Sequence, residues 1–186
     1  MLAMLCKFTL NLMHVKHGKK LKLKGTPLIF NKKGATIEIG DNCIIKSSFW
    51  SNLVGLYSRT IILTRVEKAR IVIGNNVGIS GATIYARSEI TIGNNTNIGG
   101  NVKILDNDFH PIDSYARLEN DITQIGTAPI HIGENCFIGC NALILKGTTL
   151  GNNCVVGAGA VVSGTFEDDC VLAGNPAKII KRLTKS

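Results

Sequence analysis

The chain has 186 residues, which fits one domain, and 45% of them are hydrophobic, which excludes a globally disordered protein. Its 21 basic and 13 acidic residues give a net charge of +8, which favours an anionic partner such as a nucleic acid, a membrane surface or a phosphorylated cofactor. No stretch of the sequence has the length and apolar content of a membrane-spanning helix.

Residues 1–36 are predicted to form an N-terminal segment with a short helix over Met1–Met13 and the first strands. Lys7 interrupts the apolar run and no small-residue cleavage site follows, so the run does not resemble a signal peptide. The lysines that follow leave contact with a membrane surface open for this segment. Without a secretory signal the six cysteines are expected to be reduced thiols, and we predict a cytoplasmic location.

Residues 37–172 carry an internal repeat. The motif Ile-Gly-x-Asn begins at Ile39, Ile73, Ile92 and Ile132, with a variant at Leu150. In the most regular part an aliphatic residue returns every six positions, at Ile132, Ile138, Ile144, Leu150, Val156 and Val162. A period of six is neither helical nor that of a single strand, so it predicts short strands that wind into a three-sided coil and stack their aliphatic residues into one core.

The corners of the predicted coils fall on Asn76, Asn95, Asn135 and Asn153, a residue type that tolerates positive φ. A second, small inward position follows each aliphatic residue by four, and Cys43, Cys136 and Cys154 occupy it. Packing therefore explains these three cysteines without any metal.

Two segments interrupt the repeat. Residues 47–70 are an irregular excursion that contains Trp50, which either stacks on a sugar ring or plugs the end of the coil. Residues 105–129 form a long inserted loop, a length that is usually functional or disordered. This loop contains His110 between Asp106, Asp108 and Asp113. By composition alone the histidine is either solvated or functional.

The loop reads Asp-x-Asp-x-His-Pro with a later Arg117, and the chain closes with Val171–Arg182, an apolar and basic segment. Together with the corners, these motifs resemble the hexapeptide-repeat acyltransferases, especially the maltose, galactoside and capsular-polysaccharide O-acetyltransferases. The resemblance covers most of the chain. It implies an all-β, left-handed parallel β-helix with one long inserted loop and a short C-terminal helix over residues 173–186.

The resemblance also implies roles for individual residues. His110 stands where the family has its general base, and Asp106, Asp108 or a backbone carbonyl would orient its ring. The implied coenzyme A contacts are Phe137, Gly139, Cys140, Ala158, Ser163, Lys178 and Lys181. The implied acceptor contacts are Ser80, Arg87, Arg117 and Trp50. The backbone N–H of Gly139 or Cys140 is a candidate donor to the oxyanion.

We therefore expect a homotrimer that transfers acetyl from acetyl-CoA to a hydroxyl of a sugar, in a cell-surface polysaccharide or its precursor. Arg87, where relatives carry an acidic residue, suits an acidic or phosphorylated sugar. We expect neither a bound metal nor a nucleic-acid partner. Two alternatives stay open, an N-acyltransferase of an amino sugar nucleotide and a non-catalytic β-helix scaffold.

Overall fold

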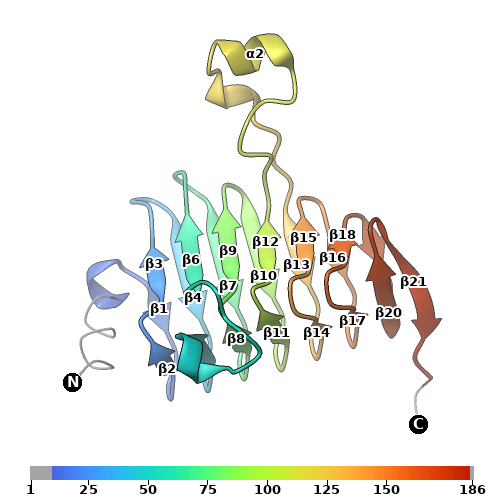
Figure 1. The fold of residues 1–186 in the computed structure, drawn as a ribbon. Helices are drawn as coiled ribbons and strands as arrows, with labels where there is room; N and C mark the ends of the chain where they lie inside the picture. The colour runs from blue at the N-terminus through green and yellow to red at the C-terminus, as the bar shows by residue number, and fades with distance from the viewer. Residues whose placement is uncertain (1–9, 185–186) are drawn as a thin grey trace.

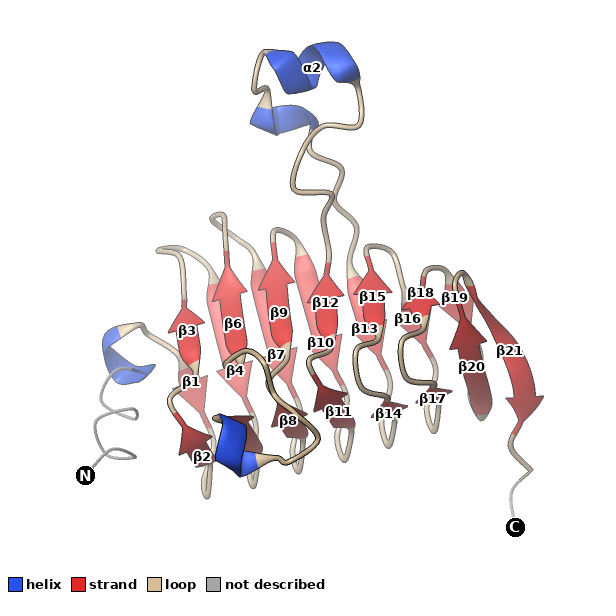
Figure 2. Ribbon diagram, in the orientation of Figure 1, coloured by secondary structure: helices blue, strands red, loops and turns tan. Residues whose placement is uncertain are grey.

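A computed structural model describes residues 10–184 of the chain. Residues 10–12 are helical, while the rest of the helix predicted before Met13 lies outside the described residues. The described chain winds into a parallel β-helix, in which every third strand joins the same sheet (Figures 1 and 2). Three sheets, here named A, B and C, form the sides of a triangular prism.

Over residues 10–184 the three sheets contain seven, eight and six strands. Sheet A consists of β1 (Lys16–His17), β4 (Thr36–Ile39), β7 (Arg70–Ile73), β10 (Glu89–Ile92), β13 (Ile130–Ile132), β16 (Thr149–Leu150) and β19 (Thr165–Phe166). Sheet B consists of β2 (Lys22–Gly25), β5 (Ile44–Ser47), β8 (Gly78–Ser80), β11 (Asn97–Gly100), β14 (Phe137–Ile138), β17 (Val155–Val156), β20 (Cys170–Gly174) and β21 (Ala177–Arg182). Sheet C consists of β3 (Leu28–Phe30), β6 (Ile61–Thr64), β9 (Thr83–Ala86), β12 (Lys103–Leu105), β15 (Leu143–Leu145) and β18 (Val161–Val162).

The core is a stack of aliphatic columns, one residue from each coil. In sheet B, Ile45 pairs in register with Ile79, which pairs with Ile98 and then with Ile138, and all are buried. The six aliphatic residues predicted from the period of six are likewise buried, which confirms that prediction. Each such side chain stabilises the stack by about 1.5–3 kcal/mol.

The corner between sheets A and B confirms the second prediction from the repeat. Asn76, Asn95, Asn135 and Asn153 all have φ between 54° and 59°. Their side chains form ladders between coils, as in the bond of 3.0 Å from Asn76 Nδ2 to Asn95 Oδ1. The thiols of Cys43, Cys136 and Cys154 are buried beneath this corner, as the repeat predicted.

The C-terminal segment differs from the prediction. Residues 173–186 were expected to contain a short helix, but the described part turns back at Asn175–Pro176, and β21 pairs antiparallel with β20. A strand hydrogen-bonds the open edge of sheet B, which a helix would leave unpaired. The prediction of a C-terminal helix is therefore wrong.

Two segments leave the coils. The insertion joins β12 to β13 and contains α2 (Ser114–Leu118) and η2 (Ile122–Gln124). It projects away from the prism as the yellow arm in Figure 1. The excursion joins β5 to β6 and contains η1 (Phe49–Ser51), drawn in teal over the side of the prism. The first coil, β1 to β3, pairs with β4 to β6, so the β-helix already begins at Lys16.

Candidate active site

His110 lies at the base of the insertion, where the chain leaves the corner between sheets C and A. A neck ties the two ends of the insertion together, because Asp108 N–H donates to Gly126 O and Ala128 N–H donates to Asp106 O, both at 3.0 Å. Just beyond the neck, His110 N–H donates to the carbonyl of Asp108 at 2.7 Å. The imidazole is exposed and makes no hydrogen bond within residues 10–184, so both ring nitrogens are free to meet a substrate.

Asp106 contacts the preceding coil and not the His110 ring. Its buried carboxylate accepts the backbone N–H of Arg87 at 2.8 Å and that of Ser88 at 2.6 Å. Asn107 Nδ2 donates a further bond at 3.1 Å. These bonds hold the insertion to the preceding coil and occupy the carboxylate. Within the described residues this carboxylate makes no hydrogen bond to the His110 ring.

Three further charged residues connect parts of the insertion with one another or with neighbouring coils. Asp108 Oδ2 forms an ion pair with Lys146 Nζ at 3.3 Å, which ties the neck to the coil below. Arg117 donates to the carbonyls of Pro111 and Ile112 at 2.9 and 2.8 Å. Arg87 Nη2 reaches Ile122 O at 3.5 Å. The two arginines predicted to contact the acceptor therefore brace the insertion in the isolated chain.

A groove of about 450 Å³ runs between sheet B and the excursion. It is lined by Ile44, Lys46, Asn52, Val54, Gly78, Ile79, Ser80, Asn97, Ile98, Gly99, Gly100, Phe137 and Cys140. Ser80, Phe137 and Cys140 were predicted site residues, and the structure brings these three together here. Lys46 is the charged residue of the lining, which contains no carboxylate. The groove thus combines an apolar floor with a few polar groups, as small-molecule sites do.

The excursion is fixed over this groove by Asn101. Its Nδ2 donates to Gly55 O at 2.9 Å, and its Oδ1 accepts Tyr57 N–H at 3.2 Å. Sequence reasoning missed this wall, because the excursion has no repeat. A sequence feature that marks the wall is Gly100. A larger residue there would collide with the excursion, because its Cβ would stand 2.7 Å from Val54 Cγ1. Trp50 is 82% exposed on the excursion, so it does not plug the end of the coil.

The predicted coenzyme A contacts lie mostly along sheet B and the corner between sheets B and C. Phe137 is half exposed on the face of sheet B, and Cys140 and Ala158 lie at the B–C corner. Lys178 and Lys181 are exposed on β21. Gly139 N–H already donates to Val156 O at 2.8 Å, which leaves Cys140 N–H as the candidate oxyanion donor. Ser163 is separate, because it lies at the C–A corner between β18 and β19.

One chain does not bring His110 and the groove on sheet B together. His110 stands at the C–A corner, and in a triangular prism that corner lies opposite sheet B. The groove and most of the coenzyme A contacts are on sheet B. A site that contains both His110 and the groove therefore needs two chains.

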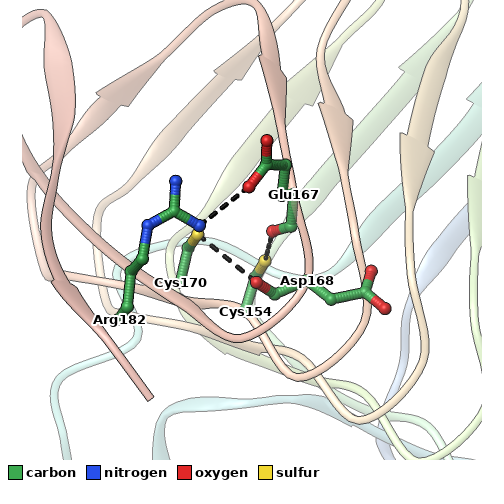
Figure 3. A network of polar contacts seen from close by, with 5 residues as sticks. All are labelled: Cys154, Glu167, Asp168, Cys170 and Arg182. Atoms are coloured by element: carbon green, nitrogen blue, oxygen red, sulfur yellow. Dashed lines mark hydrogen bonds and ion pairs between the residues drawn. The ribbon is translucent and has the colours of Figure 1, made fainter. Parts of the chain in front are cut away.

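Cys154 and Cys170 are packing residues. Figure 3 shows Cys154 donating to Glu167 O at 3.1 Å and Cys170 donating to Asp168 O at 3.4 Å, beside an exposed ion pair of 2.8 Å between Arg182 and Glu167. Burial raises the pKa of the Cys170 thiol, so it stays protonated and apolar. Within residues 10–184 no group of three or more His, Cys, Asp and Glu residues is placed to hold a metal ion.

Comparison with known proteins shows what the chain is similar to. The family model described as "Hexapeptide repeat of succinyl-transferase" matches residues 129–163. A galactoside O-acetyltransferase of Lactococcus lactis is 28% identical over 160 residues, which are 80% of this chain and 64% of the relative. A putative lipopolysaccharide biosynthesis O-acetyl transferase of Escherichia coli is 36% identical over 118 residues, 60% of each chain. The chain thus carries the hexapeptide repeat and is similar to known acetyltransferases.

Solved structures agree on the fold of this hexapeptide-repeat protein. A galactoside acetyltransferase in complex with coenzyme A aligns with a TM-score of 0.59 at 24% identity, over 91% of this chain and 65% of that one. An N-acyltransferase from Bacillus cereus aligns with a TM-score of 0.69 at 17% identity, over 96% and 89%. The fold is the left-handed parallel β-helix, as predicted. The chain spans about three fifths of the length of the curated relatives it matches.

Proposed function

We propose that the protein is an acetyl-CoA-dependent O-acetyltransferase that acts on a hydroxyl of a sugar, in a cell-surface polysaccharide or its precursor. The observation that carries the proposal is the exposed His110 at the base of an insertion that interrupts otherwise regular coils. Supporting it, the two relatives described above are named as a galactoside and a putative lipopolysaccharide O-acetyltransferase. The same proposal includes a cytoplasmic location, where acetyl-CoA is available.

In the proposed reaction His110 accepts the proton of the acceptor hydroxyl as that oxygen attacks the carbonyl carbon of the acetyl thioester. General-base help of this kind contributes about 10²–10⁴ in rate. The tetrahedral intermediate places its oxyanion near the backbone N–H of Cys140. Its collapse breaks the carbon–sulfur bond, and the imidazolium returns the proton to the departing thiolate of coenzyme A.

The site is proposed to form between two chains of a homotrimer. The C–A corner of one chain, with His110 and Ser163, would face sheet B of its neighbour, with Phe137, Cys140 and the groove. A cyclic arrangement repeats this heterologous contact at each interface and closes the ring. Lys178 and Lys181 would then lie where the phosphates of coenzyme A leave the groove, since well-formed charge-assisted bonds suit phosphate.

The test is an acceptor panel of hydroxylated sugars, acidic sugars and amino sugar nucleotides, incubated with acetyl-CoA and followed by product mass. The proposal expects a mass gain of one acetyl group on an alcohol acceptor and release of the free thiol of coenzyme A. Transfer only to amines would contradict the proposal and support the N-acyltransferase alternative, which is the activity named for the similar Bacillus cereus enzyme. Failure to bind coenzyme A at all would leave a non-catalytic scaffold.

A further inference from the structure

The net charge of the protein is confined to one end of the sequence. Residues 1–36 contain eight lysines and no acidic residue, whereas residues 37–186 contain 13 basic and 13 acidic residues. The whole net charge of +8 therefore belongs to the first 36 residues, and the rest of the chain is neutral. A distribution this uneven points to an anionic partner at that end.

The fold gathers seven of these lysines around the first coil, at one end of the prism. This lysine collar consists of Lys16, Lys19, Lys20, Lys22, Lys24, Lys32 and Lys33, and every member is exposed. The collar includes residues of β1 and β2 and of the corners that follow β1 and β3, so it surrounds the end instead of following one face. Within residues 10–184, Lys16 is the one collar lysine with an acidic partner, Glu38 at 2.9 Å.

Apolar side chains are exposed at the same end of the prism, just before β1 and on the outer face of β3. Leu12 is 65% exposed, Leu28 is 43% exposed and Phe30 is 41% exposed. The sequence that precedes the described residues is also mostly apolar, with Leu2, Met4, Leu5 and Phe8 around a single lysine. Lysines side by side with exposed aliphatic and aromatic groups are typical of surfaces that bind the headgroups and the upper acyl region of anionic lipids.

We propose that this end of the β-helix docks end-on to an anionic lipid bilayer. Exposed apolar groups beside the collar lysines favour a bilayer over a nucleic acid, whose phosphate surface offers them no contact. End-on docking leaves the insertion free, because it projects from the side of the prism in Figure 1, and the groove opens along sheet B from β5 onward, one coil in from the collar. In the proposed trimer with parallel axes, three collars would face the same membrane plane.

The experiment measures flotation of the full chain with vesicles of phosphatidylcholine, with and without phosphatidylglycerol. Binding is expected only to the anionic vesicles, and added salt should weaken it because exposed charges are screened. Lys32→Glu with Lys33→Glu should weaken it about 30-fold or more, since each lysine near an anionic surface contributes about a factor of five. The control is Arg65→Glu with Lys103→Glu, which changes the net charge equally at exposed positions outside the collar and should leave most binding intact.

Equal loss in both double variants would show that overall charge and not the collar controls association, and would overturn the proposal. So would equal binding to neutral and anionic vesicles, or tighter binding to a labelled DNA duplex than to anionic vesicles at the same salt concentration. Melting curves of both variants check that each is folded. Coenzyme A binding and acetyl transfer to a soluble acceptor are separate readouts, so the docking surface and the proposed function can fail independently.

Discussion

The backbone N–H of Ser88 donates to the buried carboxylate of Asp106 at 2.6 Å, which joins the base of the insertion to the coil before it. The sequence motif suggested Asp106 as one candidate to orient the ring of His110. Its position shows instead how the chain supports a long loop on a stack of short coils. The carboxylate satisfies N–H groups at a corner where the regular ladder is interrupted.

Asp106→Asn should lower the free energy of unfolding by about 1–3 kcal/mol, because an amide NH₂ would face backbone N–H donors in a buried site. The pH dependence follows from burial, which raises the pKa of Asp106, although bonds from Arg87 and Ser88 act in the opposite direction. The folded chain then keeps this proton at pH values where the unfolded chain has lost it. The stabilisation that this bound proton gives the folded chain is present below the ordinary pKa of an aspartic acid and is lost as pH rises through the raised pKa.

The measurement is denaturant unfolding of both proteins across acidic to neutral pH. The stability difference between wild type and variant should be largest at acid pH and should narrow as pH rises. A difference that widens toward neutral pH would contradict the assigned pKa direction, and no difference at any pH would contradict the structural role.

His110→Ala should reduce acetyl transfer by about 10²–10⁴-fold while leaving the melting temperature and coenzyme A affinity almost unchanged. The imidazole is exposed and contributes little to the packed coils. His131→Ala is the matched control, because His131 is an exposed histidine on β13 that bonds Thr91 Oγ1 through Nδ1 at 2.8 Å. If the His110 variant retains more than about a tenth of the activity, His110 is not the base.

Cys140 should be the thiol of the described chain that alkylation reaches first, and acetyl-CoA should protect it. It lines the groove and is partly exposed, whereas Cys43, Cys136, Cys154 and Cys170 are buried. Burial also raises the pKa of Cys43 and Cys170, which lowers their thiolate fraction. Peptide mass spectrometry after brief treatment with N-ethylmaleimide reads each site separately. Modification of Cys140 at a rate that acetyl-CoA does not alter would remove it from the cofactor site.

Gly100→Ala should raise the KM for the acceptor by about ten- to a hundredfold, because the new Cβ would displace Val54 and with it the wall of the groove. Adding Val54→Ala should restore much of the affinity by making room for the methyl group. Steady-state kinetics of the single and double variants test this. No rescue in the double variant would mean that Gly100 acts through something other than the excursion.

The regular part of the molecule could be predicted from the sequence, because each coil repeats one physical requirement. An aliphatic residue every six positions fixes the columns through Ile98 and Ile138, and asparagine fixes the corners. The irregular parts could not be predicted in this way. The bonds that Asn101 makes to the excursion cross more than 40 positions and have no periodic signal. The strand over Ala177–Arg182 depends on an open sheet edge that only the assembled fold presents.

In the proposed homotrimer, His110 of one chain acts in the groove of another. Two inactive variants test it directly, His110→Ala and Cys140→Trp, the second of which fills the groove. When equal amounts are co-expressed with different tags and assemble at random, about one interface in four combines an intact His110 with an intact groove. The whole co-expressed population should therefore recover about a quarter of the wild-type activity. Mixed oligomers that copurify through both tags and remain inactive would contradict the shared site.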